Sequence, residues 1–329
     1  MGEPKLRILV VTNMYPTEEN PWSGMFVKDT VDLMRIRELD VDVLFIKGRR
    51  TALKYVAGIF RLWWRMGRKK YDLLHAYYVY SGIVARAQFT HPVVLTLCGS
   101  DVNLPSQRLF SKMLSRMVSR TVVQTRRMRQ LLAREGATVM HMGVNLSLVR
   151  PLPIKEARAR LGLEPGGRFA LFPYDPARRV KRHDLFSQAV ELAKRKEPRL
   201  RPLMMNEAPR QLVATYMSAA DVMVLTSESE GSPTTIKEAL ACGLPVVSVD
   251  VGDVAELIAG VEGCWLSEAR EEAVAEGILK ALSFGRRTEG RKRAEELSSE
   301  VTVEKLKELY GEVLREKRGP VGACQSRVF

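Results

Sequence analysis

The sequence predicts an α/β protein built from two Rossmann-like domains in tandem that face each other across a cleft. Short apolar segments of β type alternate with amphipathic helical segments along the whole chain, which is the pattern of doubly wound parallel sheets. The chain has 329 residues, more than one hydrophobic core usually organises. A segment rich in proline and glycine, residues 150–167, interrupts the alternation and is expected to connect the two domains.

Residues 1–150 are predicted to form the first domain. Its strands are expected at 7–12, 41–46, 73–76, 93–97, 121–124 and 139–142. Its helices are expected at about 25–38, 51–67, 80–88, 106–119 and 126–134.

Residues 151–329 are predicted to form the second domain. Its strands are expected at 168–173, 200–205, 222–226, 245–249 and 264–266. Its helices are expected at about 181–196, 209–219, 233–242, 253–259 and 269–284. Two further helices, near 288–297 and 303–317, are expected to pack back toward the first domain.

The formal net charge of +14 is concentrated in the first half of the chain. Residues 1–150 contain 24 Lys and Arg against 11 Asp and Glu, whereas residues 151–329 contain 28 against 27. This asymmetry indicates a polyanionic partner for the first half, such as an anionic membrane surface, a phosphorylated lipid or nucleic acid. Ordinary surface charge that keeps the protein soluble is the alternative.

The four cysteines show no metal-ligand or redox spacing, so we expect no zinc site and a reducing compartment. The apolar stretch at 55–66 is interrupted by Arg61 and Arg65 before the ~20 residues that a spanning helix needs. The first apolar run, residues 8–11, is too short for a signal peptide. We therefore expect a cytoplasmic protein that can lie peripherally on the inner face of the cell membrane.

The segment 221–253 is the most informative part of the sequence. A predicted strand ends in a polar loop, and Ser232 followed by Pro233 predicts the cap and first residue of a helix. The free backbone N–H groups of such a helix start can bind a phosphate group. Glu230 precedes this start and Glu238 lies in the second turn, where their carboxylates can accept hydrogen bonds from sugar hydroxyls.

The segment EGSPTTIKE, with its flanks DVMVLTS and ALACGLPVV, resembles the E-x7-E signature of the retaining glycosyltransferases of family 4, which have the GT-B fold. The similarity extends over the whole chain, through RILVVTNMYP, VLTLCGSD and FPYDPARRVKR. It implies transfer of a sugar from a nucleoside diphosphate to an acceptor with retention of configuration. It also implies that Glu230 contacts the donor sugar and Glu238 the ribose. The other donor-binding residues that it implies here are Gly231, Ser232, Pro233 and Thr234.

The resemblance also implies a basic pair that binds the donor diphosphate, here Arg178 and Lys181, in place of a metal ion. No metal and no cofactor other than a UDP- or GDP-linked sugar is then expected. A solvated charge run before a helix is the alternative for these residues. The family usually has a glycine–arginine pair after the preceding strand, where this chain has Tyr174 and Asp175, which leaves open which arginine takes the role.

Two more loop positions follow from the resemblance. Gly24 corresponds to a glycine loop close to the donor phosphate, and a simple turn glycine is the alternative. Many relatives carry a histidine where this chain has Cys98, and a thiol cannot replace imidazole as a strong hydrogen-bonding partner. Asp101 or the backbone is expected to take over that role, unless activity is reduced or absent. His75 is a further polar substitute, or else a structural histidine at a strand end.

The segment 51–70 is predicted to be a basic amphipathic helix. Lys54, Arg61, Arg65 and Arg68 form one stripe, next to a broad apolar face that includes Trp63 and Trp64. By resemblance, the first domain binds the acceptor and the membrane, so these six residues are the predicted membrane or acceptor surface. A crossover helix that only packs on its sheet is the alternative.

The predicted function is therefore a glycosyltransferase with a lipid-linked or polysaccharide acceptor, in cell-envelope polysaccharide assembly. A sugar epimerase of the same fold and a catalytically weak scaffold that binds nucleotide sugars are the alternatives. Nucleic-acid binding is disfavoured, because only Trp63 and Trp64 could stack on bases among the basic residues.

Overall fold

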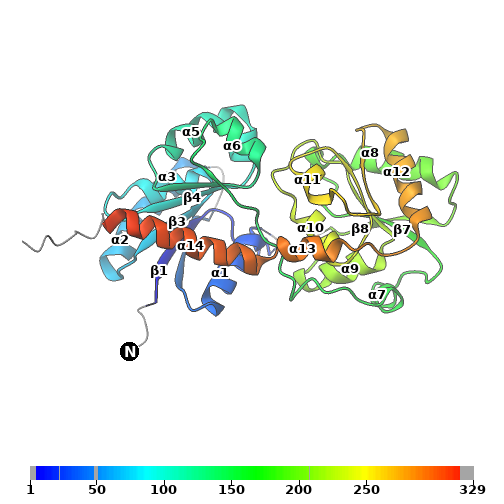
Figure 1. The fold of residues 1–329 in the computed structure, drawn as a ribbon, viewed down its shortest axis with the longest axis horizontal. Helices are drawn as coiled ribbons and strands as arrows, with labels where there is room; N and C mark the ends of the chain where they lie inside the picture. The colour runs from blue at the N-terminus through cyan, green and yellow to red at the C-terminus, as the bar shows by residue number, and fades with distance from the viewer. Residues whose placement is uncertain (1–4, 22, 48–50, 207, 319–329) are drawn as a thin grey trace, which may run out of the picture.

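The computed structural model describes residues 5–21, 23–47, 51–206 and 208–318. They form two α/β domains that lie side by side (Figure 1). The first domain holds a parallel six-stranded sheet in the order β2-β1-β3-β4-β5-β6. The strands are β1 (Arg7–Thr12), β2 (Asp40–Phe45), β3 (Leu73–Tyr77), β4 (Val93–Leu97), β5 (Arg120–Val123) and β6 (Thr138–Val139).

Both faces of this sheet are buried, as parallel sheets require. In β1, Ile8 and Val10 enter one core, whereas Leu9 and Val11 enter the core on the other face. Side chains alternate between the faces because a strand has a period of two residues. The helices of this half are α1 (Met25–Ile36), α2 (Ala52–Arg68), α3 (Val79–Arg86), α4 (Ser100–Asn103), α5 (Pro105–Ser115) and α6 (Arg126–Leu132).

The second domain holds a parallel five-stranded sheet in the order β11-β10-β9-β7-β8. The strands are β7 (Arg168–Phe172), β8 (Leu200–Met204), β9 (Val222–Leu225), β10 (Val246–Val249) and β11 (Cys264–Ser267). Since β7 pairs with β8 on one side and β9 on the other, the chain direction of the crossovers reverses there. Ligands of such sheets bind beyond the carboxyl ends of the strands at this point.

The helical segments of the second half are α7 (Ile154–Arg160), η1 (Arg179–Lys181), α8 (His183–Lys194), η2 (Arg210–Leu212), α9 (Val213–Ala219), α10 (Thr234–Ala241), α11 (Val254–Ile258), α12 (Glu271–Phe284), α13 (Gly290–Glu296) and α14 (Ser299–Arg318). Among the described residues, no helix is both long and apolar enough to cross a membrane.

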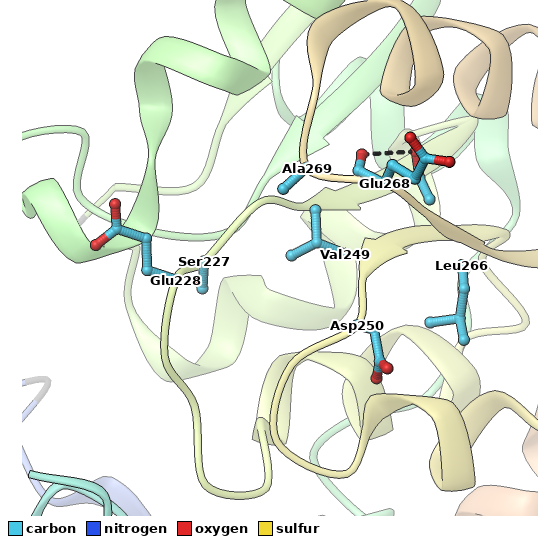
Figure 2. A pocket seen from close by; sticks show the side chains of 8 residues that line it. Ser227, Glu228, Val249, Asp250, Leu266, Glu268 and Ala269 are labelled. Carbon is cyan, nitrogen blue, oxygen red and sulfur yellow. Dashed lines mark hydrogen bonds between the residues drawn. The ribbon is translucent and has the colours of Figure 1, made fainter.

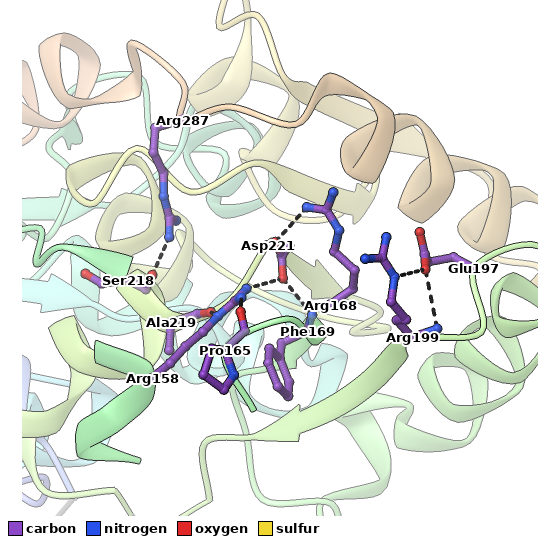
Figure 3. Close-up of polar contacts among 10 residues, drawn as sticks. All are labelled: Arg158, Pro165, Arg168, Phe169, Glu197, Arg199, Ser218, Ala219, Asp221 and Arg287. Atoms are coloured by element: carbon purple, nitrogen blue, oxygen red, sulfur yellow. Dashed lines mark hydrogen bonds and ion pairs between the residues drawn. The ribbon is translucent and has the colours of Figure 1, made fainter. Parts of the chain in front are cut away.

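Short α7, in the connection between the domains, is tied to the second domain by a buried ionic network (Figure 3). Arg158 donates to the Asp221 carboxylate at 2.8 Å and to the carbonyl oxygens of Ala219 and Pro165 at 3.1 and 2.7 Å. The same carboxylate accepts from Arg168 at 3.2 Å. The network satisfies charges that would be costly to bury alone, and it fixes the connection to the second sheet.

The last helix, α14, returns to the first domain and lies along it (Figure 1), whereas α13 packs against α10 in the second domain. Five apolar side chains of α14 complete the first-domain core on the α1 face of the sheet. They are Val303, Leu306, Leu309, Tyr310 and Val313. The chain therefore crosses between the domains twice.

His75 of β3 forms the polar link between α14 and the first sheet. Its Nδ1 lies 2.5 Å from the Tyr310 hydroxyl and its Nε2 2.8 Å from Thr96 Oγ1. The ring is fully buried, which lowers the pKa of His75 to about 3 and keeps it neutral. The expectation that His75 replaces the family histidine is therefore wrong, and the structural alternative holds.

Candidate active site

The carboxyl ends of the two sheets meet through backbone segments that contact each other. A Cβ added to Gly99, after β4, would lie 3.3 Å from Cα of Gly231. A Cβ on Gly231 would lie 3.0 Å from the carbonyl oxygen of Cys98. Asn103 of the first domain donates to the carbonyl oxygen of Glu230 at 2.9 Å. Glycine on both sides lets the Glu230 loop rest directly on the first domain.

Glu230 forms a compact polar cluster with residues that follow β7. Its Oε1 accepts from Lys181 Nζ at 2.5 Å and from the Tyr174 hydroxyl at 3.0 Å. The lysine ammonium also lies 3.6 Å from the centre of the Tyr174 ring. The Tyr174 hydroxyl is 2.9 Å from Thr235 Oγ1. The tyrosine that departs from the family pattern thus orients the glutamate next to the start of α10.

Lys181 is held in place by the residue that follows β9 and is almost completely buried. Thr226 Oγ1 donates to the Lys181 carbonyl oxygen at 3.0 Å. Burial lowers the pKa of Lys181, the Glu230 carboxylate opposes this, and the positive charge of Arg178 adds to the lowering. Arg178 itself is exposed, one turn before Lys181. The structure therefore brings both predicted basic residues to the end of β7, with only Lys181 in contact with Glu230.

The helix that follows the Glu230 loop begins one residue later than expected. α10 starts at Thr234, and Pro233 occupies the capping position without a side-chain hydrogen bond. Ser232 does not cap the helix, because its Oγ lies 3.4 Å from Nδ1 of His141 in the first half of the chain. The predicted Ser232 cap is therefore wrong, and Ser232 takes part in the contact between the domains instead.

Glu238, in α10, forms an ion pair with Arg210, a residue that no sequence motif singles out. Arg210 donates through Nη1 to the Glu238 carboxylate and through Nη2 to Asp29 Oδ2, the latter at 3.2 Å. Asp29 belongs to α1 of the first domain. The side chains of Arg210, Asp29 and Glu238 are 17, 10 and 6% exposed, so this bridge between the domains is largely buried.

Asp101 lies under the loop that follows β4 and does not face the cleft. Its carboxylate is buried and accepts from the backbone N–H groups of Cys98 and Gly99 at 3.0 and 2.9 Å. Burial raises the pKa of Asp101 to about 6, against the effect of these hydrogen bonds. This geometry therefore does not favour a direct contact between Asp101 and a substrate. The side chain orders the Cys98–Gly99 loop on which Gly231 rests.

Gly24 is explained by its own loop. It caps α1 with φ +68°, and a Cβ there would lie 2.3 to 2.6 Å from backbone atoms of Met14 and Tyr15. Any side chain would break this approach, which accounts for the glycine as a turn residue. The predicted donor contact of Gly24 has no further observation in its favour.

Two pockets flank the loops that follow β9 and β10. The smaller lies between the domains, with Glu228 and Glu230 on one wall and Arg108 and Arg127 on the other. The larger, about 490 Å³, lies at the carboxyl ends of β9, β10 and β11 (Figure 2). Its carboxylates come from Glu228, Asp250 and Glu268. None of the predicted site residues lines this larger pocket.

Two of the basic residues of α2, the predicted membrane helix, bind the first sheet instead of facing away from it. Arg61 and Arg65 donate to carbonyl oxygens of the edge strand β2, those of Phe45 and Val43, at 3.2 and 3.1 Å. Arg68 lies 4.1 Å over the ring of Trp64, and Lys54 is exposed. The basic stripe is therefore partly used to cover the edge of the sheet.

A second face of α2 remains exposed and apolar. Exposed apolar side chains continue on α3, which packs against α2, and on α5 and the turn after it, which pack against α3. We call this surface the apolar face. It consists of Leu53, Val56, Phe60, Trp63, Trp64, Ile83, Leu109, Phe110, Met113 and Met117. Only Gly58 and Leu62 of α2 are buried. The helix packs on the sheet with one side, as the alternative required, and presents large apolar side chains on the other.

Two family models match the chain. The one described as "Glycosyl transferase 4-like" matches residues 28–142, and the one described as "Glycosyl transferases group 1" matches residues 187–283. Together they match more than half of the chain. The protein belongs to the group 1 glycosyltransferases and has the GT-B fold, as predicted. Retention and membership of family 4 are consistent with these matches.

Among its curated relatives, the chain is 25% identical to the putative teichuronic acid biosynthesis glycosyltransferase TuaC of Bacillus subtilis, over 84% of this chain and 89% of the relative. It is 26% identical to a D-inositol 3-phosphate glycosyltransferase of Thermobispora bispora, over 82% and 77%. The solved sucrose-phosphate synthase of Thermosynechococcus elongatus has a TM-score of 0.77 at 18% identity, covering 94% of this chain and 99% of that one. Anabaena HepE in complex with UDP has a TM-score of 0.70 at 15% identity, covering 93% and 100%.

Proposed function

We propose that this protein transfers a sugar, with retention of configuration, from a UDP- or GDP-linked donor to a lipid-linked or polysaccharide acceptor. The observation that carries the proposal is the largely buried Lys181–Glu230–Tyr174 cluster, beyond the carboxyl ends of the neighbouring strands β7 and β9. Such a cluster offers a carboxylate for sugar hydroxyls and a cation for the leaving diphosphate at one place. The complex of Anabaena HepE with UDP and the glycosyltransferase relatives support this reading.

In the proposed reaction, the bond between the anomeric carbon and the diphosphate oxygen breaks, and the acceptor oxygen bonds to the anomeric carbon on the same face. The proton of the acceptor hydroxyl passes to the leaving diphosphate. Lys181 and Arg178 would stabilise the charge that builds up on the leaving diphosphate, so that no metal ion is required. Glu230 would hold the sugar through its hydroxyls, and Glu238 would accept from the ribose. Cys98 lies at the position of the family histidine, and the Cys98 carbonyl and Gly99 backbone would line the sugar there.

A thermal-shift screen with UDP, GDP, ADP and their common sugars tests the donor site. A ligand that binds only the folded protein must raise its Tm. We expect one nucleotide family to raise Tm in the wild type, and Glu238→Ala to lose that shift. Glu276→Ala, an exposed glutamate on α12, should keep it.

The absence of any nucleotide shift in a cooperatively melting wild type would contradict the proposal. A shift without transfer or slow donor hydrolysis would instead favour the catalytically weak scaffold, in which Cys98 leaves the site unable to turn over.

We also propose that the apolar face docks on an anionic membrane, at the cytoplasmic side where nucleotide sugars are available. Trp and Phe side chains beside lysine and arginine are suited to the headgroup region of a bilayer. The excess positive charge of residues 1–150 is complementary to anionic lipids. A role in cell-envelope polysaccharide assembly fits this location and the similarity to TuaC.

Flotation with phosphatidylglycerol vesicles measures this docking. Phe60→Ser with Trp64→Ser removes two aromatic side chains that are exposed in the free protein. Burying a side chain of this size in the bilayer contributes about 1.5 to 3 kcal/mol, so we expect at least about a tenfold loss of vesicle binding. Ile36→Ser is the matched control, because Ile36 is 74% exposed on α1, on the opposite face of the sheet. Equal binding of wild type and double variant would contradict the docking.

A further inference from the structure

Arg210 connects three elements that are far apart in the sequence. It lies in η2 after β8, and its guanidinium joins Glu238 of α10 to Asp29 of α1. The first contact is within the second domain and the second crosses to the first domain. One side chain therefore links the predicted ribose carboxylate directly to the opposite domain.

The charges in this bridge do not balance. Two carboxylates share one guanidinium, and burial raises the pKa of Asp29 although Arg210 opposes that rise. Arg210 Nε is buried and has no hydrogen-bond partner among the described residues. The two carboxylates thus compete for the same guanidinium, and each accepts only some of the N–H groups that Arg210 can donate.

Because Arg210 donates to Asp29 as well as to Glu238, it occupies only part of the Glu238 carboxylate. Arg210 contacts only Oε1 of Glu238, because its Nη2 is turned to Asp29. If Nη2 were released from Asp29, the planar guanidinium could bind both oxygens of Glu238, the arrangement that arginine and carboxylate prefer. Ribose hydroxyls would then have to compete with Arg210 for the same two oxygens.

We propose that Asp29 and Arg210 are positioning residues for the donor. Asp29, from the first domain, holds Arg210 in a shared position that leaves one oxygen of Glu238 free for the ribose. Nucleotide affinity thereby depends on a residue of the domain that does not carry the nucleotide site. This inference rests on the proposed function, because it takes Glu238 as the ribose ligand.

Titration calorimetry with the nucleotide found in the thermal-shift screen tests it, in Asp29→Asn, Arg210→Gln and the double variant. Asparagine keeps an acceptor oxygen but carries no charge, so it holds Nη2 of Arg210 less strongly than aspartate does. We therefore expect Asp29→Asn to weaken nucleotide binding about tenfold, with a matching rise in KM for the donor and little change in kcat. In the Arg210→Gln background, Asp29→Asn should have no further effect, since the competitor is gone. This non-additivity separates positioning from a general loss of stability.

Asp32→Asn is the matched control, because Asp32 lies one turn further along α1 and pairs with Lys28 and Arg35 of the same helix. Nucleotide binding that is equal in wild type and Asp29→Asn, or an effect of Asp29→Asn that persists unchanged in Arg210→Gln, would overturn the inference. If Glu238→Ala abolishes binding while Asp29→Asn has no effect, the proposed donor site stands and only the role of Asp29 is lost. A wild type that binds no nucleotide would overturn the proposed function itself.

Discussion

Replacing Lys181 by methionine should reduce sugar transfer by at least about a hundredfold. The Lys181 ammonium lies 2.5 Å from Glu230 Oε1, in a nearly water-free position where a charge has a large effect on a nearby ionic transition state. Methionine keeps the length and most of the apolar contacts of the lysine stem. The loss should therefore appear in kcat, measured as transfer or slow hydrolysis of the nucleotide sugar that the wild type binds.

The buried Glu230 carboxylate loses its cation in this variant, which also lowers stability. A double variant, Lys181→Met with Glu230→Gln, removes both charges and should recover the stability without recovering activity. Lys292→Met serves as the control for the loss of a surface charge, because its side chain is 82% exposed. Transfer by Lys181→Met at the wild-type rate would contradict the role assigned to Lys181.

Replacing Tyr310 by alanine should lower the free energy of unfolding of the first domain by about 3 to 5 kcal/mol, the range for a large buried aromatic side chain. Tyr310 is fully buried, and its hydroxyl is the partner of His75 Nδ1. Tyr310→Phe keeps the ring and removes only the hydroxyl, so about 1 kcal/mol is expected. Urea denaturation followed by circular dichroism measures both variants.

Glu308→Ala is the control for this helix, because Glu308 lies on the exposed side of α14. It should change the midpoint by little. A Tyr310→Ala protein as stable as Glu308→Ala would show that α14 does not contribute to the first-domain core.

Most strands were predictable because they carry a complete local signal. The strand expected at 139–142 is wrong in its bounds, since β6 consists of Thr138–Val139 alone. Buried runs such as Ile8–Val11 and Val222–Leu225 are apolar on both faces and flanked by polar residues, which identifies parallel strands without knowledge of their neighbours. The four-residue helix α4 was missed, since so short a segment has no periodicity. α14 begins four residues earlier than predicted, at Ser299, because backbone contacts with Val144 position that end.

The site was predictable only where the sequence repeats a known pattern. Glu230 and Lys181 could be singled out by resemblance, and the structure brings their side chains together. Tyr174 stood out in the sequence as a departure from the family pattern, but nothing in the sequence indicated that its hydroxyl donates to Glu230. The bridge from Arg210 to Asp29 joins residues 181 positions apart, and no pattern along the chain encodes a contact of that kind. Asp101 was misread because an acidic residue after a strand can serve the backbone as well as a ligand.

The return of α14 to the first domain has a consequence for how the protein is made. A ribosome releases the chain from its first residue onward, and domains generally fold in that order. Here the α1 face of the first sheet lacks five core side chains until the final helix has been synthesised. The second domain can thus finish its core before the first, which has to wait with apolar surface uncovered. Nascent chains that stop short of Ser299 should depend on chaperones for this reason.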